Sequence, residues 1–461
     1  MTASPPVPDS FEQPSGDELV TFTVLCQPAS GIGIEEFNRR LAVSSLDGLL
    51  PADTTLASVA KQLRELRFEV FDIPGPVVFA RGTVDRFEET FGAQLVKLTR
   101  QVSRDSRRPR TMTTVVIRPG TEVRSVNAIE GALLVTVAEP PLLAQPAMPD
   151  PGAKGTRDFC LRLPAGIART TRASSTHRQL TPAGDRATGR GVVVAVIDTG
   201  FARHPFFTKH PYQITLLAAP DAEAPEVDEF GHGTPVLANL VACAPDARVY
   251  AIKYGERVDV AFCVAMAIPN VRVISLSWGY KRPSNLPDFM LILQFLIVFA
   301  VVAQGVTVIV ASGNDIGETC PANRPEVISV GGVSFDNGSP EAWDGTSSFQ
   351  SKFHPGRSAP DLCGIASLIR LPMPPPPKGK RYGWECADGG TSCAAPQVAG
   401  IAALLIQKKP SLTPHDVRGA LMNNGTDILT GSTFTGDVAA LGPDNATGGG
   451  LVNALKAWLS V

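Results

Sequence analysis

The chain has 461 residues, more than a single hydrophobic core usually organises, so we expect at least two folded units. Hydrophobic residues make up 44% and charged residues 19%, a balance that is typical of globular proteins and excludes wholesale disorder. The formal net charge is only -2, so no strong field exists to attract nucleic acid or anionic lipid, and neither is expected as a partner.

The beginning of the chain carries no recognisable export signal. Residues 1–18 lack a basic start followed by an apolar stretch, so we expect a flexible tail and a cytoplasmic protein. Eight cysteines are too sparse for a disulfide scaffold, and none forms a CxxC pair with zinc-ligand spacing. Most of them are therefore expected to be buried thiols.

Short elements alternate over residues 19–139. TFTVLC, VVFARG, AQLVKL and ALLVTV predict strands, and helices are expected around 34–50, 55–66 and 84–91. This pattern predicts a small α+β domain. Residues 140–190 are rich in Pro, Gly, Ala, Arg, Ser and Thr, which is typical of a linker, and Arg169 to Arg190 is a candidate processing site within it.

Residues 191–461 have a different pattern. The runs VVVAVID, ARVYAIKY, VRVISLSW, VTVIVAS and EVISVGGV are apolar without alternation, which predicts strands of a parallel sheet that is covered by helices on both faces. Helical stretches separate several of these runs, so we predict an α/β domain with a doubly wound, mostly parallel sheet.

One apolar segment, Phe289 to Ala311, is long enough to imitate a membrane span. Two glutamines and a glycine interrupt it, and its second half is β-branched and runs into the turn-like SGN. We interpret it as a buried helix followed by a buried strand, with no membrane span.

Polar residues stand where the predicted strands end. Asp198, Ser277 and Asn314 follow three apolar runs, while His232 and Ser392 open predicted helices. In open α/β sheets ligands bind beyond the carboxyl ends of the strands, so these five groups can converge on one edge.

Three of these residues together have the parts of a nucleophilic centre. Taken singly, Ser392 would be interpreted as a helix N-cap, His232 as a structural histidine and Asp198 as a turn-capping carboxylate. A serine hydroxyl needs an imidazole to take its proton, however, and the imidazole needs a carboxylate to fix its tautomer. The coincidence of all three favours a catalytic triad.

The segments around these residues resemble the signature blocks of the subtilase family of serine peptidases. The matching blocks are VIDTG at 196–200 with HP at 204–205, GHGT at 231–234, and GTSCAAPQVAG at 390–400. Further similarity runs in the family's order through APDA, SLSWG, ASGN and CPA to GGGLVNA, from Gly191 to about Trp458.

The resemblance implies a subtilisin-type fold and a serine endopeptidase that cleaves protein or peptide substrates through an acyl-enzyme. It implies that Asn314 completes the oxyanion hole. The implied substrate-binding residues are Ser277, Trp278, Gly279, Ala311, Ser312, Gly313 and Asp315. Asp315 would favour a basic or polar side chain before the scissile bond, although it could equally be a surface residue after a turn.

Some features depart from the family pattern without removing a catalytic group. Gln397 and Pro235 replace residues that are often histidine, and Cys393 stands where methionine is common. Leu371 to Trp384 is an inserted polyproline loop, interpreted as a surface excursion or, alternatively, as a cover near the site. No compact acidic loop resembles a calcium site and no HExxH occurs, so no metal or cofactor is expected.

The N-terminal unit resembles the activation domain of sedolisin-type proenzymes, through VVFARGTVDRFEETFGAQL at 77–95 and VAKQLRELRFEV before it. The resemblance implies a ferredoxin-like fold that acts as an intramolecular inhibitor until the linker is cut. The alternative is an interaction domain that is never removed.

Two rival functions are open to test. An aspartic protease would need two DTG carboxylates, and the chain has only Asp198-Thr199-Gly200. A catalytically silent subtilase fold used as a binding module would usually show a broken triad, whereas Asp198, His232 and Ser392 are all present.

Overall fold

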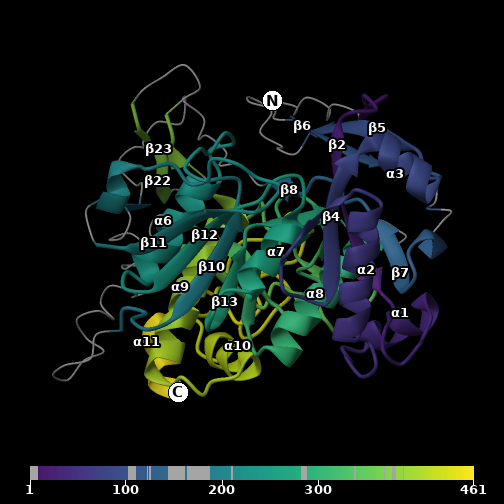
Figure 1. Ribbon diagram of the computed structural model, residues 1–461. Helices are drawn as coiled ribbons and strands as arrows, with labels where there is room; N and C mark the ends of the chain where they lie inside the picture. The colour runs from purple at the N-terminus through teal and green to yellow at the C-terminus, as the bar shows by residue number, and fades with distance from the viewer. Residues whose placement is uncertain are drawn as a thin grey trace.

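Figure 1 shows the computed structural model, in which an N-terminal domain packs against a larger α/β domain. The structure describes residues 9–101, 111–121, 123, 126–143, 161–162, 187–208, 211–281, 288–336, 339–367, 369–375, 381–387 and 389–461.

The α/β domain is built on an eight-stranded sheet in the order β11-β12-β10-β13-β15-β17-β18, with β21 also paired to β17. All pairs are parallel except β17 with β18. The strands are β10 Val193–Asp198, β11 Gln213–Ala218, β12 Arg248–Lys253, β13 Val271–Leu276, β15 Thr307–Ala311, β17 Ile328–Asp336, β18 Ser339–Ala342 and β21 Leu362–Ile365. The predicted doubly wound, mostly parallel sheet is confirmed.

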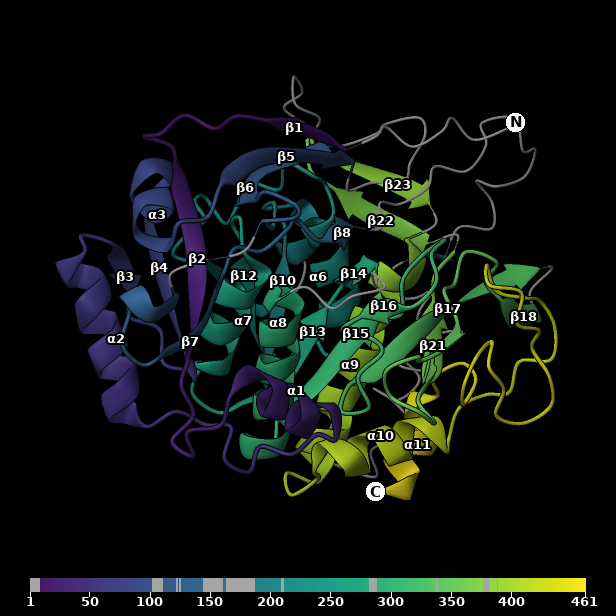
Figure 2. The ribbon, with the colours of Figure 1, turned by 90° about the vertical axis from the view of Figure 1, so that its right-hand side faces the viewer.

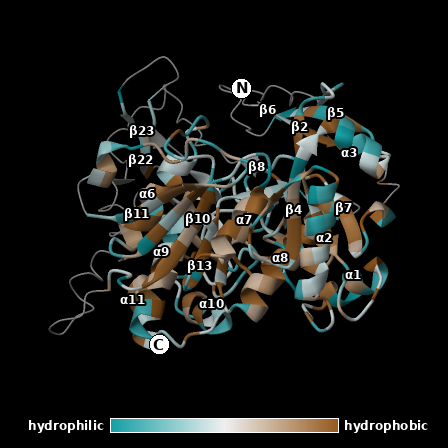
Figure 3. Ribbon diagram, viewed as in Figure 1, coloured by the Kyte–Doolittle hydropathy of each residue, from teal (hydrophilic) through white to brown (hydrophobic). Residues whose placement is uncertain are grey.

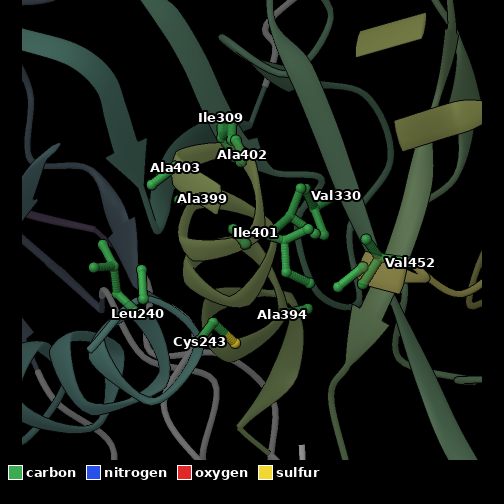
Figure 4. Close-up of a cluster of buried hydrophobic side chains, with 14 of the residues drawn as sticks. Leu240, Cys243, Ile309, Val330, Ala394, Ala399, Ile401, Ala402, Ala403 and Val452 are labelled. Atoms are coloured by element: carbon green, nitrogen blue, oxygen red, sulfur yellow. The ribbon is translucent and has the colours of Figure 1, made fainter. Parts of the chain in front are cut away.

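Helices cover both faces of this sheet. Helices α6 (Gly233–Cys243) and α9 (Gly390–Lys408) lie on one face, and α7 (Val258–Met266) and α8 (Asp288–Val298) lie on the other. Strand β10 contributes Val194 and Val196 to the first core and Ala195 and Ile197 to the second, because successive side chains point to opposite faces. Figure 4 shows the first core around α9, where Ile401 and Ala402 lie near Ile309 and Val330.

The long apolar segment folds as the sequence predicts. It forms α8, a π-helical turn at Phe299–Ala303, and strand β15. Within the described part of the chain, none of the helices has the length and apolar character needed to cross a bilayer.

The N-terminal domain has a four-stranded antiparallel sheet in the order β3-β4-β2-β7. With its helices this is the strand order of the ferredoxin-like fold, as expected. The elements are β2 Leu19–Cys26, α1 Ile34–Ala42, α2 Asp53–Glu65, β3 Glu69–Phe71, β4 Val77–Thr83, α3 Val84–Phe91, η1 Val126–Ala128 and β7 Ala132–Thr136. The helix expected over 34–50 is shorter: it ends at Ala42, and Ser44 has a φ of +58°, outside the helical region.

A second small sheet extends this domain. It joins β1 (Ser10–Glu12), β5 (Leu95–Gln101) and β6 (Thr111–Ile117), and β6 was not predicted. The stretch expected to be a flexible tail at 1–18 therefore contains a paired strand, whereas residues 1–8 lie outside the described part.

The predicted linker contains two short strands. Strand β8 (Leu142–Leu143) pairs antiparallel with β14 (Trp278–Lys281), which also pairs with β16 (Thr319–Cys320). Strand β9 (Leu161–Arg162) pairs with β22 (Ile369–Met373), which also pairs antiparallel with β23 (Gly383–Ala387). The proline-rich residues lie between β22 and β23 in the sequence. Figure 2 shows both small sheets near one end of the α/β domain. Of the candidate processing site, Arg169 to Arg190, residues 169–186 lie outside the described residues.

The remaining elements are η2 Pro205–Thr208, β19 Phe349–Gln350, β20 Ser358–Ala359, α10 Pro414–Met422 and α11 Ala454–Ser460. Six of the cysteines (26, 243, 263, 320, 363 and 393) are described with their side chains, and all six are buried free thiols, as the composition predicts.

Candidate active site

Asp198 and His232 are brought together by the ends of a strand and a helix. Asp198 is the last residue of β10, and His232 is the N-cap residue of α6. His232 Nδ1 lies 2.7 Å from Asp198 Oδ1, and the exposed fractions of the two side chains are 1% and 0%. Thr199 N donates to the same Oδ1 at 2.8 Å. The carboxylate therefore favours the tautomer with the proton on Nδ1.

Gly233 allows this close approach. A Cβ at this position would collide with the carbonyl oxygen of Gly200 and would lie 3.0 Å from Asp198 Cβ. No other residue has the space to start α6 directly beside the end of β10. The glycine after the histidine is thus explained by the packing of the helix against the strand.

Asp228 organises the same junction, and the sequence patterns did not single it out. Its Oδ1 accepts from Thr199 Oγ1 at 2.8 Å and His232 N at 3.2 Å, and its Oδ2 accepts from the backbone and hydroxyl of Thr234 at 2.9 and 2.7 Å. Burial raises the pKa of Asp228, against the hydrogen bonds that lower it, with the Asp198 charge raising it further. The signal in the sequence that could have identified Asp228 is its position four residues before His232, which opens a helix.

Ser392 lies in the first turn of α9. The helix begins at Gly390 with Gly389 as its N-cap, so Ser392 is not itself the cap that its sequence context suggests. Ser392 Oγ donates to Ser277 O at 2.9 Å, and Ser277 Oγ donates to Ser392 O at 2.8 Å. The Ser392 amide is among the first N–H groups of the helix, which have no acceptor within the helix.

Asn314 is oriented by the residue before the serine. Its Oδ1 accepts from Thr391 N at 3.1 Å and Thr391 Oγ1 at 2.7 Å. Because the oxygen is occupied, the Nδ2 group is the end that remains a donor. Gly390 has φ of +63°, and a Cβ there would collide with Asn314 Nδ2. Only glycine lets the helix start so close to the amide.

These groups lie at the switch point of the sheet. The chain leaves β10 for β11 and β12 on one side and later forms β13 and β15 on the other. Ligands in such sheets bind in the crevice where the strand order reverses, beyond the carboxyl ends. Asp198 is the last residue of β10, Ser277 follows the end of β13, and Asn314 follows β15. The edge predicted from the sequence is the one at which they meet.

The predicted substrate strand is already paired. Trp278 and Gly279 belong to β14, where Trp278 is opposite Leu143 and Gly279 is opposite Leu142. Trp278 also donates its Nε1 to the carbonyl of Ile197 at 3.2 Å, which fixes β14 to the end of β10. The end of the N-terminal region is therefore paired with the strand that the sequence predicts to bind an extended substrate.

The remaining predicted pocket residues, Ala311, Ser312, Gly313 and Asp315, lie at the end of β15 and in the turn that follows it. Asp315 has φ of +51° and donates its N–H to Gly345 O at 2.9 Å. Thr319, which was not predicted, lies behind this turn. Its Oγ1 donates to Ser312 O at 2.6 Å, and its Cγ2 lies 2.8 Å from where a Cβ on Gly313 would stand.

The proline-rich insertion lies beside His232. A Cβ on Gly231 would be 3.5 Å from Met373 Cε and from Pro374 Cγ. The other strand of the hairpin is tied to the body of the domain because His204 Nε2 lies 2.9 Å from Gly383 O. The flanking residues form two paired strands next to Gly231. Whether the insertion is a surface excursion or, alternatively, a cover stays a prediction.

Metal-dependent catalysis and catalysis by a cysteine thiolate both have little support in the described residues. No group of three or more His, Cys, Asp or Glu side chains there is placed to hold a metal ion. Cys393 is next to Ser392, but burial raises the pKa of its thiol, so the reactive thiolate is disfavoured.

Comparison with known proteins agrees with the geometry. Residues 189–450 match the subtilase family. The chain is 28% identical over 310 residues to M-protease of Shouchella clausii, covering 63% of this chain and 69% of that protein. It is equally similar to Subtilisin BL of Lederbergia lenta, of which the match covers 97%.

A solved structure shares the fold. The crystal structure of fervidolysin from Fervidobacterium pennivorans, described as a keratinolytic enzyme related to subtilisin, superposes with a TM-score of 0.54 at 18% identity. The superposition covers 97% of this chain and 62% of that chain.

Proposed function

The chain belongs to the subtilase family of serine peptidases, and from this premise we propose that it is an endopeptidase with Asp198, His232 and Ser392 as its triad. The observation that supports this most directly is the 2.7 Å contact between His232 Nδ1 and Asp198 Oδ1 at the sheet edge that also carries Ser392. Protein or peptide chains are the proposed substrates.

Each residue has a definite role in the proposed reaction. His232 carries its proton on Nδ1 toward Asp198, so Nε2 is the basic nitrogen that takes the Ser392 proton. The Ser392 hydroxyl, which donates to Ser277 O, must rotate to do so. The resulting alkoxide attacks the peptide carbonyl and forms the acyl-enzyme, His232 protonates the leaving amine, and water then releases the acid.

Asn314 and the Ser392 amide form the proposed oxyanion hole. Thr391 occupies the oxygen of the Asn314 amide and thereby directs Nδ2 as the donor. The amide of Ser392 adds the second donor from the start of α9. Removal of one such donor typically lowers the rate about 100-fold to 1,000-fold.

We also infer that the N-terminal region inhibits the enzyme. The pairing of β8 with β14 places residues 142 and 143 on the strand edge that a substrate needs. The same backbone groups of β14 cannot pair with β8 and with a substrate at the same time. A substrate can therefore bind only after β8 has left this edge. The protein is thus proposed to be made in an inhibited form.

The test compares the wild type with Ser392→Ala by intact mass after addition of a fluorophosphonate probe. Labelling of the wild type alone supports the triad. Loss of N-terminal mass in the wild type alone shows in addition that the protein processes itself. If the wild type resists labelling even after limited proteolysis in the linker, the chain is a silent binding module instead.

A further inference from the structure

Helices α7 and α8 are strongly apolar and are buried on almost every side. The sequence of α8 is DFMLILQFLIV, and all ten residues from Phe289 to Val298 are buried. Helix α7, VDVAFCVAM, is similarly buried except at Val264. A helix with one polar face can stand on a protein surface, but a helix that is apolar all round must be covered on both sides.

The sheet covers only the inner side of these helices. On the outer side lies the N-terminal domain, as Figures 1 and 3 show, with the apolar helices between its sheet and the central sheet. Phe37 of α1 meets Phe295 of α8 at 5.1 Å between ring centroids. One continuous core joins the two domains. Its members from the N-terminal domain include Leu25, Phe37, Leu41, Leu49, Phe71, Val77, Phe79 and Ala138.

The sheet of the N-terminal domain is buried on both faces. Along β2, Val20, Phe22 and Val24 point into the domain's own core. The alternate residues Thr21 and Thr23 are 1% and 0% exposed and lie on the face toward α7. If the N-terminal domain left the catalytic domain, this face of its sheet would become exposed to water. The nearly complete burial of its side chains is not expected for such a face.

A buried ion pair anchors this face. Arg257, only 1% exposed, pairs with Asp259 at 2.6 Å at the start of α7. The guanidinium also donates to the carbonyls of Thr136 at 2.8 Å and Thr21 at 3.4 Å, and Asp259 accepts from Thr23 Oγ1 at 3.0 Å. Removal of the N-terminal domain would take these acceptors from the guanidinium.

A second buried pair anchors α1. Arg324 is 0% exposed and pairs with Glu326 at 2.6 Å. The same guanidinium donates to Leu41 O at 3.1 Å and Ser44 Oγ at 3.3 Å, both in the N-terminal domain. Both ion pairs therefore make hydrogen bonds from the catalytic domain to the N-terminal domain.

We propose that the N-terminal domain is a permanent subunit of the folded enzyme, which remains on α7 and α8 after the linker is cut. Only β8 then switches the active site, by leaving β14 while the domain stays bound. The second part rests on the proposed function, whereas the first part requires no catalysis.

The composition of the interface decides between a permanent and a transient contact. Transient interfaces are about as polar as ordinary protein surface, while obligate ones resemble a domain core cut in half. This interface has an apolar core and two buried ion pairs whose guanidinium groups also donate hydrogen bonds across it. Breaking such pairs by removing their partners is strongly unfavourable. Both features are those of an obligate interface.

The test uses the Ser392→Ala chain with a recognition sequence for a specific protease inserted within 169–186. After cutting in native buffer, we expect the two fragments to co-elute on size exclusion at micromolar concentration and to separate only in denaturant. Elution of the N-terminal fragment alone, with a folded catalytic fragment, would overturn the proposal whether or not the chain is a peptidase.

A pair of variants probes the interface itself. Phe37→Asp places a charge in the shared core and is expected to lower the co-eluting fraction at least tenfold. Phe11→Asp changes a phenylalanine of the same domain that is 51% exposed and should leave it unchanged. Equal retention by both variants would contradict the proposed interface. If Phe37→Asp gives no soluble protein, the cut Ser392→Ala chain decides alone.

The switching part has its own readout. In the cut chain with Ser392 intact, we expect fluorophosphonate labelling in fractions that still contain the N-terminal fragment. Labelling confined to fractions that have lost it would show that the domain, and not β8, must leave.

Discussion

Ser277 and Ser392 are joined by two reciprocal hydrogen bonds, in which each hydroxyl donates to the other residue's backbone carbonyl, at 2.8 and 2.9 Å. This pair links the end of β13 to the first turn of α9. It holds the proposed nucleophile beside the proposed substrate strand.

We expect Ser277→Ala to lower stability by about 1 kcal/mol, the usual contribution of one buried hydrogen bond. It should also lower kcat/KM several-fold, because the first turn of α9 loses an anchor. Thermal unfolding and peptide hydrolysis measure the two effects. Ser275→Ala is the control, because the Ser275 hydroxyl is buried and has no hydrogen-bond partner among the described residues. Equal effects of both substitutions would refute the special role of Ser277.

Asp228 should act on catalysis through His232. Asp228→Asn removes a charge and at least one of four accepted hydrogen bonds, so we expect a loss of about 2 kcal/mol in unfolding free energy. Loss of a nearby negative charge disfavours protonated His232, so the acid limb of kcat/KM should move to lower pH. Glu229→Gln, which alters the pair between the neighbouring carboxylate and Lys253, should change both quantities less.

Thr319 should restrict the side chain before the scissile bond. It lies behind Gly313, and its Cβ is 3.9 Å from where a Cβ on Gly279 would stand, so it fills the space between β14 and the turn after β15. We therefore expect the enzyme to prefer alanine over phenylalanine at that position. In the sequence, Leu143 is followed by Ala144, which lies outside the described residues.

Thr319→Gly should raise kcat/KM for the phenylalanine peptide relative to the alanine peptide at least about tenfold. Thr319→Val keeps the shape and loses the hydroxyl, so it should keep the preference for alanine. A preference for arginine in the wild type would instead support the expectation for Asp315.

Backbone pairing of β8 should be needed for inhibition. Proline at both 142 and 143 removes two N–H donors and disfavours the strand, so Ser392 should be labelled by the probe faster than in the unsubstituted chain. The same double substitution with Ser392→Ala should remain unlabelled. Unchanged labelling rates would mean that β8 does not control access.

Stability should depend on pH through two buried groups with opposite signs. Burial, with the Arg324 guanidinium, lowers the pKa of His354 from 6.5 to about 4. Between these values the unfolded chain binds the proton and the folded chain does not, so stability is lost as pH falls. Burial raises the pKa of Asp221 from 3.8 to about 6, so here stability is lost as pH rises through this range. Each effect amounts to at most about 3 kcal/mol.

The two effects can be separated by variants in the Ser392→Ala background. Asp221→Asn should leave the loss of stability from pH 6.5 to 4, whereas His354→Gln should remove it. Urea unfolding at several pH values measures the difference between the two variants. Parallel pH profiles for the two would contradict both assignments.

Much of the catalytic domain could be predicted because its signals are local. Unbroken apolar runs identified the parallel strands, and the blocks around Asp198, His232 and Ser392 identified the family. The helix after the serine was predicted to start later than Gly390, since glycines and a proline obscure its first turn. The cytoplasmic location and the cleavage within 169–190 stay predictions.

The sequence by itself determined the strand ends on which the candidate catalytic groups stand and the apolar character of the segment from Phe289 to Ala311. Only the tertiary structure decided what covers that segment and what lies on the substrate edge. Asp228, Thr319 and the pairing of Leu143 with Trp278 depend on residues far apart in the chain or on turns without a periodic pattern. Such contacts arise when packed elements meet, so no local regularity of the sequence records them.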